Sequence, residues 1–93
     1  MFVRFRERGH RLHCSLVETR RADGRVRQEH IGSLGSTAAA PSVRDRLEFW
    51  ERLHGRMAKL GNRVDSAAQA KLLGEVHARI PMVTLDEAQA ATR

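Results

Sequence analysis

Four arginines lie within eight residues around an Asp-Gly pair, and side chains of this type can bind the phosphates or base edges of a nucleic acid. They are Arg20, Arg21, Arg25 and Arg27, and Asp23 is the only acidic residue among them. A guanidinium presents a planar fork of donors that matches phosphate oxygens and guanine edges. Arginine supplies 15 of the 17 basic residues, a bias that is compatible with nucleic-acid binding and equally with a coding preference for arginine.

The five histidines and the single cysteine offer a metal site as another chemistry. His10, Cys14 and His30 could share one face of a sheet, but no fourth ligand accompanies them, and none of the common paired ligand spacings is present. His54 and His77 flank apolar helical stripes and are expected at the edge of the core. The sequence therefore predicts no metal site.

Nucleophilic catalysis is also disfavoured. Cys14 alternates with Leu12 and Leu16 in a strand-like pattern, which predicts a small core residue instead of an activated thiolate. No glycine-rich phosphate loop precedes a helix, and the pair Asp86-Glu87 is explained by helix capping. We therefore expect a protein that is not an enzyme, with no catalytic residue and no cofactor.

The arginines must be positioned by strands, because the chain has an extended pattern up to Gly35. Residues 2–6 alternate, with Val3 and Phe5 on one face and Arg4 and Arg6 on the other. This period predicts a half-buried strand that adds Arg4 and Arg6 to the basic surface. Gly9-His10 is expected to turn the chain into the next strand.

The Asp23-Gly24 pair between two extended runs predicts a β-hairpin. A two-residue turn would place Glu18 opposite Glu29, and like charges in that position are unfavourable. We therefore expect a three-residue turn, Ala22-Asp23-Gly24, which pairs Glu18 with Gln28.

The same register has consequences for both faces of the hairpin. It pairs Leu16 with His30, Cys14 with Gly32 and Leu12 with Leu34. It also predicts one face beneath the helices and an opposite face. The first carries Leu12, Cys14, Leu16 and Leu34, and the second carries Val17, Thr19 and Arg27.

From Pro41 onward the pattern is helical. Ser42 and Asp45 form a capping box, and an apolar stripe follows at Val43, Leu47, Trp50, Leu53, Met57 and Leu60, which predicts a first helix that ends near Gly61-Asn62. Because this stripe already accounts for Trp50, a base-stacking role for Phe49 and Trp50 is disfavoured.

A second helix is expected to begin at Asp65 or Ser66 and to stop before Pro81, with a stripe at Ala68, Leu72, Leu73, Val76 and Ile80. The two helices should pack as an antiparallel hairpin. Thr84 to Glu87 is a further capping box that begins a short last helix. No helix stop signal precedes Thr92-Arg93, so the sequence leaves open whether the chain is a fragment.

Together these elements predict an α+β fold: a three-stranded antiparallel sheet followed by an antiparallel helical hairpin and a short C-terminal helix. Residues 1–93 form a single small domain, with a β-meander over residues 1–35 and a helical part over residues 41–93. A chain of 93 residues is too short for the larger catalytic folds, which need more than ~100 residues.

Charge, cysteine content and the lack of long apolar runs indicate where in the cell the protein is expected. The formal net charge is +6, of which +4 lies in residues 1–37, where 8 arginines face 4 acidic residues. One cysteine excludes an internal disulfide, and no apolar run is long enough for a signal peptide or a membrane span. We expect a cytoplasmic protein with no membrane partner.

The hairpin resembles the N-terminal β-hairpin region of bacterial insertion-sequence DDE transposases. In that family a strand of the form V-E-S-x-R leads through a D-G-K turn into V-R-Q and then I-x-x-L-G. The matching residues here are Val17, Glu18, Arg20, Asp23, Gly24, Arg25 in place of the lysine, Val26, Arg27, Gln28, Ile31, Leu34 and Gly35. The family's catalytic domain, with its three carboxylates, has no counterpart after Gly35.

This resemblance covers about 35 of 93 residues and implies a detached N-terminal module of mobile-element origin, with a role in DNA end binding and assembly. We therefore predict a module that binds duplex DNA through Arg20, Arg21, Arg25 and Arg27, supported by Arg4 and Arg6. In one alternative the helical hairpin dimerises or binds a protein partner, as an adaptor or inhibitor of a host complex. In this alternative the hairpin charges bind no partner. The simplest interpretation is the same for the hairpin: its charges are solvated and only keep an exposed strand edge from aggregating.

Overall fold

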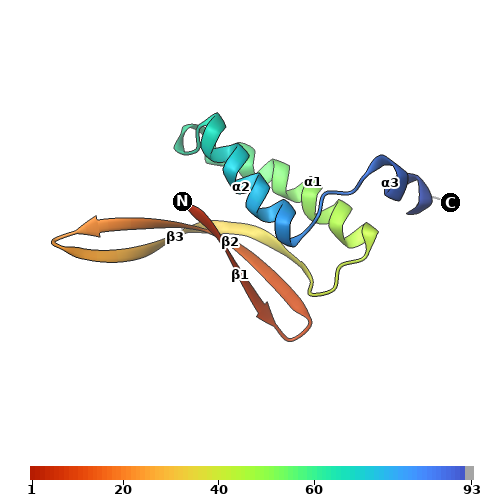
Figure 1. The fold of residues 1–93 in the computed structure, drawn as a ribbon, viewed down its shortest axis with the longest axis horizontal. Helices are drawn as coiled ribbons and strands as arrows, with labels where there is room; N and C mark the ends of the chain where they lie inside the picture. Colours follow the sequence, from red (N-terminus) through yellow and green to blue (C-terminus); the bar gives the residue numbers. More distant parts are fainter. Residues whose placement is uncertain (92–93) are drawn as a thin grey trace.

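The computed structural model describes residues 1–91 and confirms the predicted α+β architecture. The elements, in chain order, are β1 (Phe2–Arg8), β2 (Arg11–Ala22), β3 (Arg25–Ala38), α1 (Val43–Leu60), the single-turn 3₁₀ helix η1 (Gly61–Arg63), α2 (Ser66–Arg79) and α3 (Leu85–Ala91). The strands form one antiparallel sheet in the order β1-β2-β3 (Figure 1). Thr92 and Arg93, where the sequence carries no helix stop signal, lie outside the described residues.

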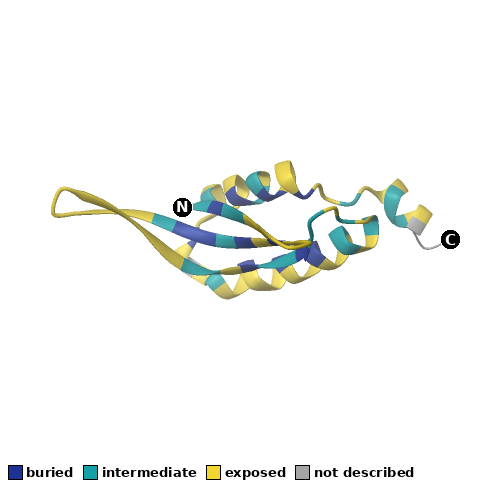
Figure 2. Cartoon of the chain, turned by 90° about the horizontal axis from the view of Figure 1, so that it is seen from below, coloured by how far each residue is buried: buried dark blue, intermediate teal, exposed yellow. Residues whose placement is uncertain are grey.

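The helical hairpin covers one face of the sheet, and we call this the helix-side face and its opposite the open face. Helix α1 packs on β3, while α2 packs on β1 (Figure 1). Residues 18–29 of the β2–β3 hairpin extend beyond the helices as a two-stranded ribbon, which we call the arm. Every residue from 19 to 30 is exposed (Figure 2). The arm gives the molecule its longest dimension of 57 Å.

The turn at the tip of the arm differs from the one predicted. Ala22 pairs with Arg25 around a two-residue Asp23-Gly24 turn, so Glu18 does lie opposite Glu29. Asp23 and Gly24 have φ of 53° and 72°, and this left-handed pair matches the twist of antiparallel strands. The prediction of a three-residue turn was wrong because it counted the repulsion between two carboxylates without the cation that binds both of them.

That cation is Arg20. Its Nε lies 2.9 Å from a carboxylate oxygen of Glu29 and 3.7 Å from one of Glu18. Arg20 lies two residues from Glu18 on the same face of β2, so it reaches both carboxylates of the cross-strand pair. An attractive contact therefore offsets the unfavourable pairing that the sequence argument had rejected.

Two β-bulges in β3 change the register closer to the helices. Val17 pairs with His30 but Leu16 pairs with Gly32, which leaves Ile31 as an extra residue; Ser15 pairs with Ser33 but Cys14 pairs with Gly35, which leaves Leu34 as another. The predicted pairs of Leu16 with His30, Cys14 with Gly32 and Leu12 with Leu34 are therefore wrong. An extra residue in one strand reverses the direction of the side chains beyond it.

The predicted core of the hairpin is nevertheless confirmed. The side chains of Leu12, Cys14, Leu16 and Leu34 are all buried with the helices in one cluster. Arg27 was expected on the opposite face, but it pairs with Arg20 and so follows the helix-side face into the arm. Val3 is buried and Phe5 packs against the same core, with Arg4 and Arg6 on the open face as predicted.

Helix α1 begins and packs almost as its sequence predicts. Ser42 and Asp45 form the capping box through two hydrogen bonds of 3.1 Å. The stripe is rotated relative to the prediction, because Phe49 is buried and Leu47 is exposed. The ring of Phe49 lies against Gly35, where a Cβ atom would be 3.3 Å from the ring, a tighter contact than a Cβ usually makes.

Helix α2 also follows its prediction, with Asp65 as N-cap and Leu72 and Val76 buried. The indole Nε1 of Trp50 donates to the carbonyl oxygen of Ile80 at 3.0 Å, which ties α1 to the end of α2. Helix α3 begins at the expected Thr84–Glu87 capping box. Arg46 of α1 holds it in place through Glu87 and, at 3.2 Å, through the carbonyl oxygen of Pro81.

No helix in the part of the chain that the structure describes has the length and apolar character needed to span a membrane.

A glycine pair tests the packing between β3 and α1. Gly35 has φ of +123°, and a Cβ built there lies 3.3 Å from the Phe49 ring, whereas a Cβ at Gly32 meets nothing within 4 Å. Gly35→Ala should therefore lower the free energy of unfolding by about 1–3 kcal/mol. Gly32→Ala should change it by no more than about 1 kcal/mol. Urea denaturation of both variants measures the difference, and equal losses would contradict the packing described.

Candidate nucleic-acid interface

The arm is a two-stranded basic ribbon that no helix covers. It carries the four arginines that the sequence singled out, Arg20, Arg21, Arg25 and Arg27, and all four are exposed. Arg20 is bound to Glu18 and Glu29, whereas Arg21, Arg25 and Arg27 form no ion pair within the described residues. Three guanidinium groups are therefore free to meet an external anion.

The register divides these arginines between two faces. Arg20 pairs with Arg27 and Ala22 pairs with Arg25, so all three arginines follow the helix-side face into the arm. Arg21 pairs with Val26 and points the other way, along the open face. The sequence predicted one cluster at the tip, and the structure distributes it over both sides of the ribbon.

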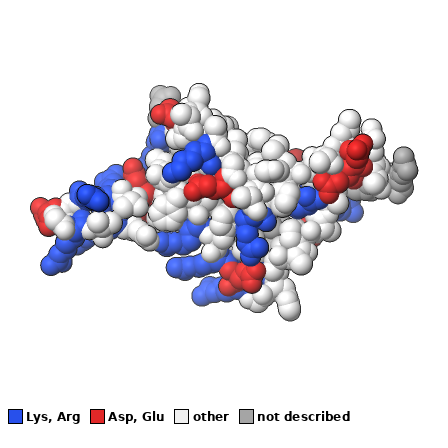
Figure 3. Space-filling view, in the orientation of Figure 1, with Lys and Arg blue, Asp and Glu red and all other residues white. Residues whose placement is uncertain are grey.

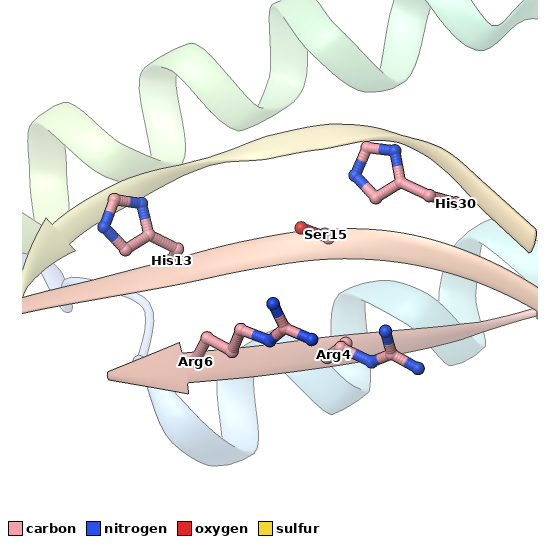
Figure 4. A pocket seen from close by; sticks show the side chains of 5 residues that line it. All are labelled: Arg4, Arg6, His13, Ser15 and His30. Atoms are coloured by element: carbon pink, nitrogen blue, oxygen red, sulfur yellow. The ribbon is translucent and has the colours of Figure 1, made fainter. Parts of the chain in front are cut away.

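The open face of the sheet adds the two supporting arginines of β1. Arg4 pairs with Ser15 and Arg6 with His13, and with His30 of β3 these side chains line a depression of about 300 Å³ (Figure 4). Arg4 donates a hydrogen bond to Oε1 of Gln28, at the base of the arm. A neighbouring depression of about 220 Å³ continues past Arg6 to Arg8.

Strand alternation places the carboxylates of the sheet on the face opposite to these arginines. The three glutamates of the strands, Glu7, Glu18 and Glu29, all follow the helix-side face. Glu7 is there bound at 3.0 Å to Arg79 of α2. Within β1, β2 and β3 the open face thus carries arginine and no acidic residue. Basic side chains gather along the arm and again over the lower middle of the molecule (Figure 3).

Sequence reasoning missed His13, Ser15 and His30 as parts of this surface because it searched for arginines. The signal was present for two of them, since His13 and Ser15 alternate with the buried Leu12, Cys14 and Leu16. His30 was expected on the helix-side face, because the predicted three-residue turn pairs it with Leu16, whereas the two-residue turn pairs it with Val17 on the open face.

The histidine and cysteine side chains that could have shared a metal are separated. Cys14 is completely buried on the helix-side face, whereas His30 lines the open face. No group of three metal-ligating side chains occurs among the described residues. Burial raises the pKa of the Cys14 thiol to about 11, although the charge of Arg79 partly opposes the shift. Its predicted place as a small core residue is confirmed.

Comparison with known protein families, curated proteins and solved structures found no match. The resemblance to transposase hairpins therefore rests on the sequence of residues 1–35 alone.

The ion pairs of Arg20 give a test of the arm's register. Arg20→Ala leaves Glu18 opposite Glu29 without the shared cation, and exposed ion pairs of this kind contribute about 0.2–1 kcal/mol. Backbone amides of the arm should then exchange with solvent about 2–5 times faster. Arg21→Ala removes the same charge from the other face and is the control. Hydrogen exchange followed by NMR measures the amide exchange rates of both variants. Equal acceleration in the two would contradict the pairing of Arg20 with Glu18 and Glu29.

The raised pKa of Cys14 predicts an unreactive thiol in the folded chain. At pH 8 a thiol of pKa about 11 has roughly 100 times less thiolate than one with the ordinary pKa of 9.0, and only the thiolate is alkylated. Iodoacetamide labelling should therefore be at least about 100-fold slower in buffer than in denaturant. Labelling followed by mass spectrometry tests this, and equal rates would place Cys14 outside the core.

Proposed function

We propose that the chain is a non-enzymatic module that binds duplex DNA through its basic β-hairpin. The observation that carries the proposal is the arm: an exposed two-stranded ribbon beyond the helices, with Arg21, Arg25 and Arg27 unpaired within the described residues. The major groove of B-DNA admits a two-stranded β-ribbon, and arginine binds both phosphates and guanine edges.

The distribution of charge supports this mode of binding. A ribbon inserted into a groove has phosphates of both DNA strands beside it, so arginines on both of its faces can make contacts. Arg25 and Arg27 would serve one side and Arg21 the other, with Arg4 and Arg6 of the open face as further contacts near the base of the arm. Arg20 is bound by two glutamates and would contribute least.

The resemblance of the hairpin to the N-terminal region of insertion-sequence transposases favours the same proposal. In those proteins this region is associated with DNA end binding and assembly. The matching residues include Arg20, Arg25 and Arg27, which are arm residues here. We therefore extend the proposal to a module of bacterial mobile-element origin that acts in the cytoplasm.

Exposed apolar side chains near α3 favour a second candidate, a protein-interaction module. Leu85 is 73% exposed and Met82 is 47% exposed, although large apolar side chains are usually covered. In this alternative the helical part forms a homodimer or binds another protein. Sedimentation separates the candidates, because only the first expects a faster-sedimenting species that depends on added duplex.

Salt dependence tests the DNA-binding proposal directly. Four to six phosphate contacts predict that log K falls with log salt with a slope of about −4 to −5. Titration of a fluorescent duplex of random sequence at several salt concentrations measures this slope. Affinity that does not fall between low and moderate salt would overturn the proposal.

Removal of the arm charges locates the interface. Replacing Arg20, Arg21, Arg25 and Arg27 with alanine should weaken duplex binding by at least about 100-fold at 0.1 M salt and reduce the magnitude of the salt slope by about 3. A control removes four exposed charges from the helical part, at Arg44, Arg52, Lys59 and Arg63. Both variants should remain folded by circular dichroism. Equal weakening of duplex binding by the two variants would contradict the proposal that the arm is the DNA-binding surface.

A further inference from the structure

Five polar side chains from all three strands converge on the depression in the open face. Arg4 and Arg6 come from β1, His13 and Ser15 from β2, and His30 from β3 (Figure 4). The depression has a volume of about 300 Å³. The helices lie on the other side of the sheet, so the depression opens to solvent.

Two of these side chains are cations without a counter-charge. Arg4 and Arg6 are two residues apart on the same face of β1, and neither forms an ion pair with any described residue. Like charges at this spacing repel each other, so a bound anion would relieve the repulsion. The nearest glutamate along β1, Glu7, is bound to Arg79 on the helix-side face.

The depression is also partly organised before any ligand arrives. The guanidinium of Arg4 is held by Gln28, which fixes its direction across β2. Ser15 lies directly opposite Arg4, and His13 lies directly opposite Arg6. The β-sheet backbone therefore sets the spacing of the side chains, and the hydrogen bond to Gln28 reduces the conformational freedom that Arg4 would lose on binding.

The set of donors favours one class of anion. Guanidinium forks and a hydroxyl group donate hydrogen bonds to tetrahedral oxyanions, and imidazoles add donors when protonated. Apart from the two imidazoles, the lining contains no aromatic ring on which a base could stack. Its volume is at the lower limit of small-molecule sites, so a phosphate group fits this description better than a whole nucleotide.

We propose that this depression is a binding site for one phosphate group, with Arg6, His13, Ser15 and His30 as donors and Arg4 held in place by Gln28. The site is separate from the arm arginines, and its phosphate binding does not depend on DNA binding by the arm. Two sources share the chemistry: a phosphodiester of a nucleic-acid backbone, and a phosphomonoester such as a 5′ end.

Inorganic phosphate is the probe for the site itself. Its addition at constant pH and ionic strength should shift the imidazole NMR signals of His13 and His30 saturably, with a dissociation constant in the millimolar range. Arg6→Gln should weaken this binding by about 10-fold or more, because hydrogen bonds to charged groups are the stronger ones. His13→Ala and His30→Ala should each weaken it by a smaller factor.

Arg63→Gln is the matched control, since Arg63 is exposed in η1, and its replacement removes the same charge away from the sheet. It should leave phosphate binding unchanged. The absence of a saturable shift would overturn the proposal. So would equal weakening by Arg6→Gln and Arg63→Gln, because the effect would then be one of net charge.

Two duplexes that differ only in a 5′-phosphate distinguish the sources. If the site takes backbone phosphodiesters, His13→Ala weakens both duplexes equally; if it takes a phosphomonoester, the variant weakens only the phosphorylated one. Either result supports a phosphate site. A chain that binds both duplexes but shows no effect of His13→Ala and no response to inorganic phosphate would refute the site while leaving the DNA-binding proposal intact.

Discussion

The pairing of β2 with β3 is the constraint on which the rest of the molecule depends. The Asp23-Gly24 turn fixes the register of the arm, and the extra residues Ile31 and Leu34 then change it twice along β3. Without the bulge at Ile31, regular alternation would put Leu34 on the same face as His30, away from the helices. With it, Leu34 enters the core, and the second bulge brings Thr37 to a buried position. A single strand can thus serve an exposed arm and a buried core.

The same alternation sorts the charges. Glu7, Glu18 and Glu29 occupy the helix-side face, where Glu7 pairs with Arg79 and the other two share Arg20, while Arg4 and Arg6 lie on the open face without a carboxylate. The net charge of +4 in residues 1–37 is therefore not spread evenly over the sheet. Its excess lies on the surface that the helices leave free, and an anionic partner is the kind that such a surface favours.

Local signals predicted much of this structure. The capping boxes at Ser42 and Thr84, the helix stop before Pro81 and the alternation of Val3 and Phe5 with Arg4 and Arg6 each depend on neighbours a few residues away, and all are confirmed. The register of β3 was not predictable in this way, because the Arg20 contact that permits Glu18 to face Glu29 involves three residues at once. The burial of Phe49 in place of Leu47 likewise depends on the space that Gly35 of β3 leaves beneath α1. The depression was missed because it unites three strands.

The helices hold the sheet in the shape that the proposed interface requires. Lys71 and Arg79 of α2 bind the two ends of β1 at Met1 and Glu7, and Arg56 of α1 donates to the carbonyl oxygen of Ser33 between the two bulges of β3. These contacts end where the arm begins, so the ribbon leaves the domain from a fixed point. His30 lies at that point and lines the depression, while Gln28 in the arm holds Arg4. The arm and the depression consequently form one continuous surface, and a nucleic acid bound along the ribbon would pass over the proposed phosphate site at its base.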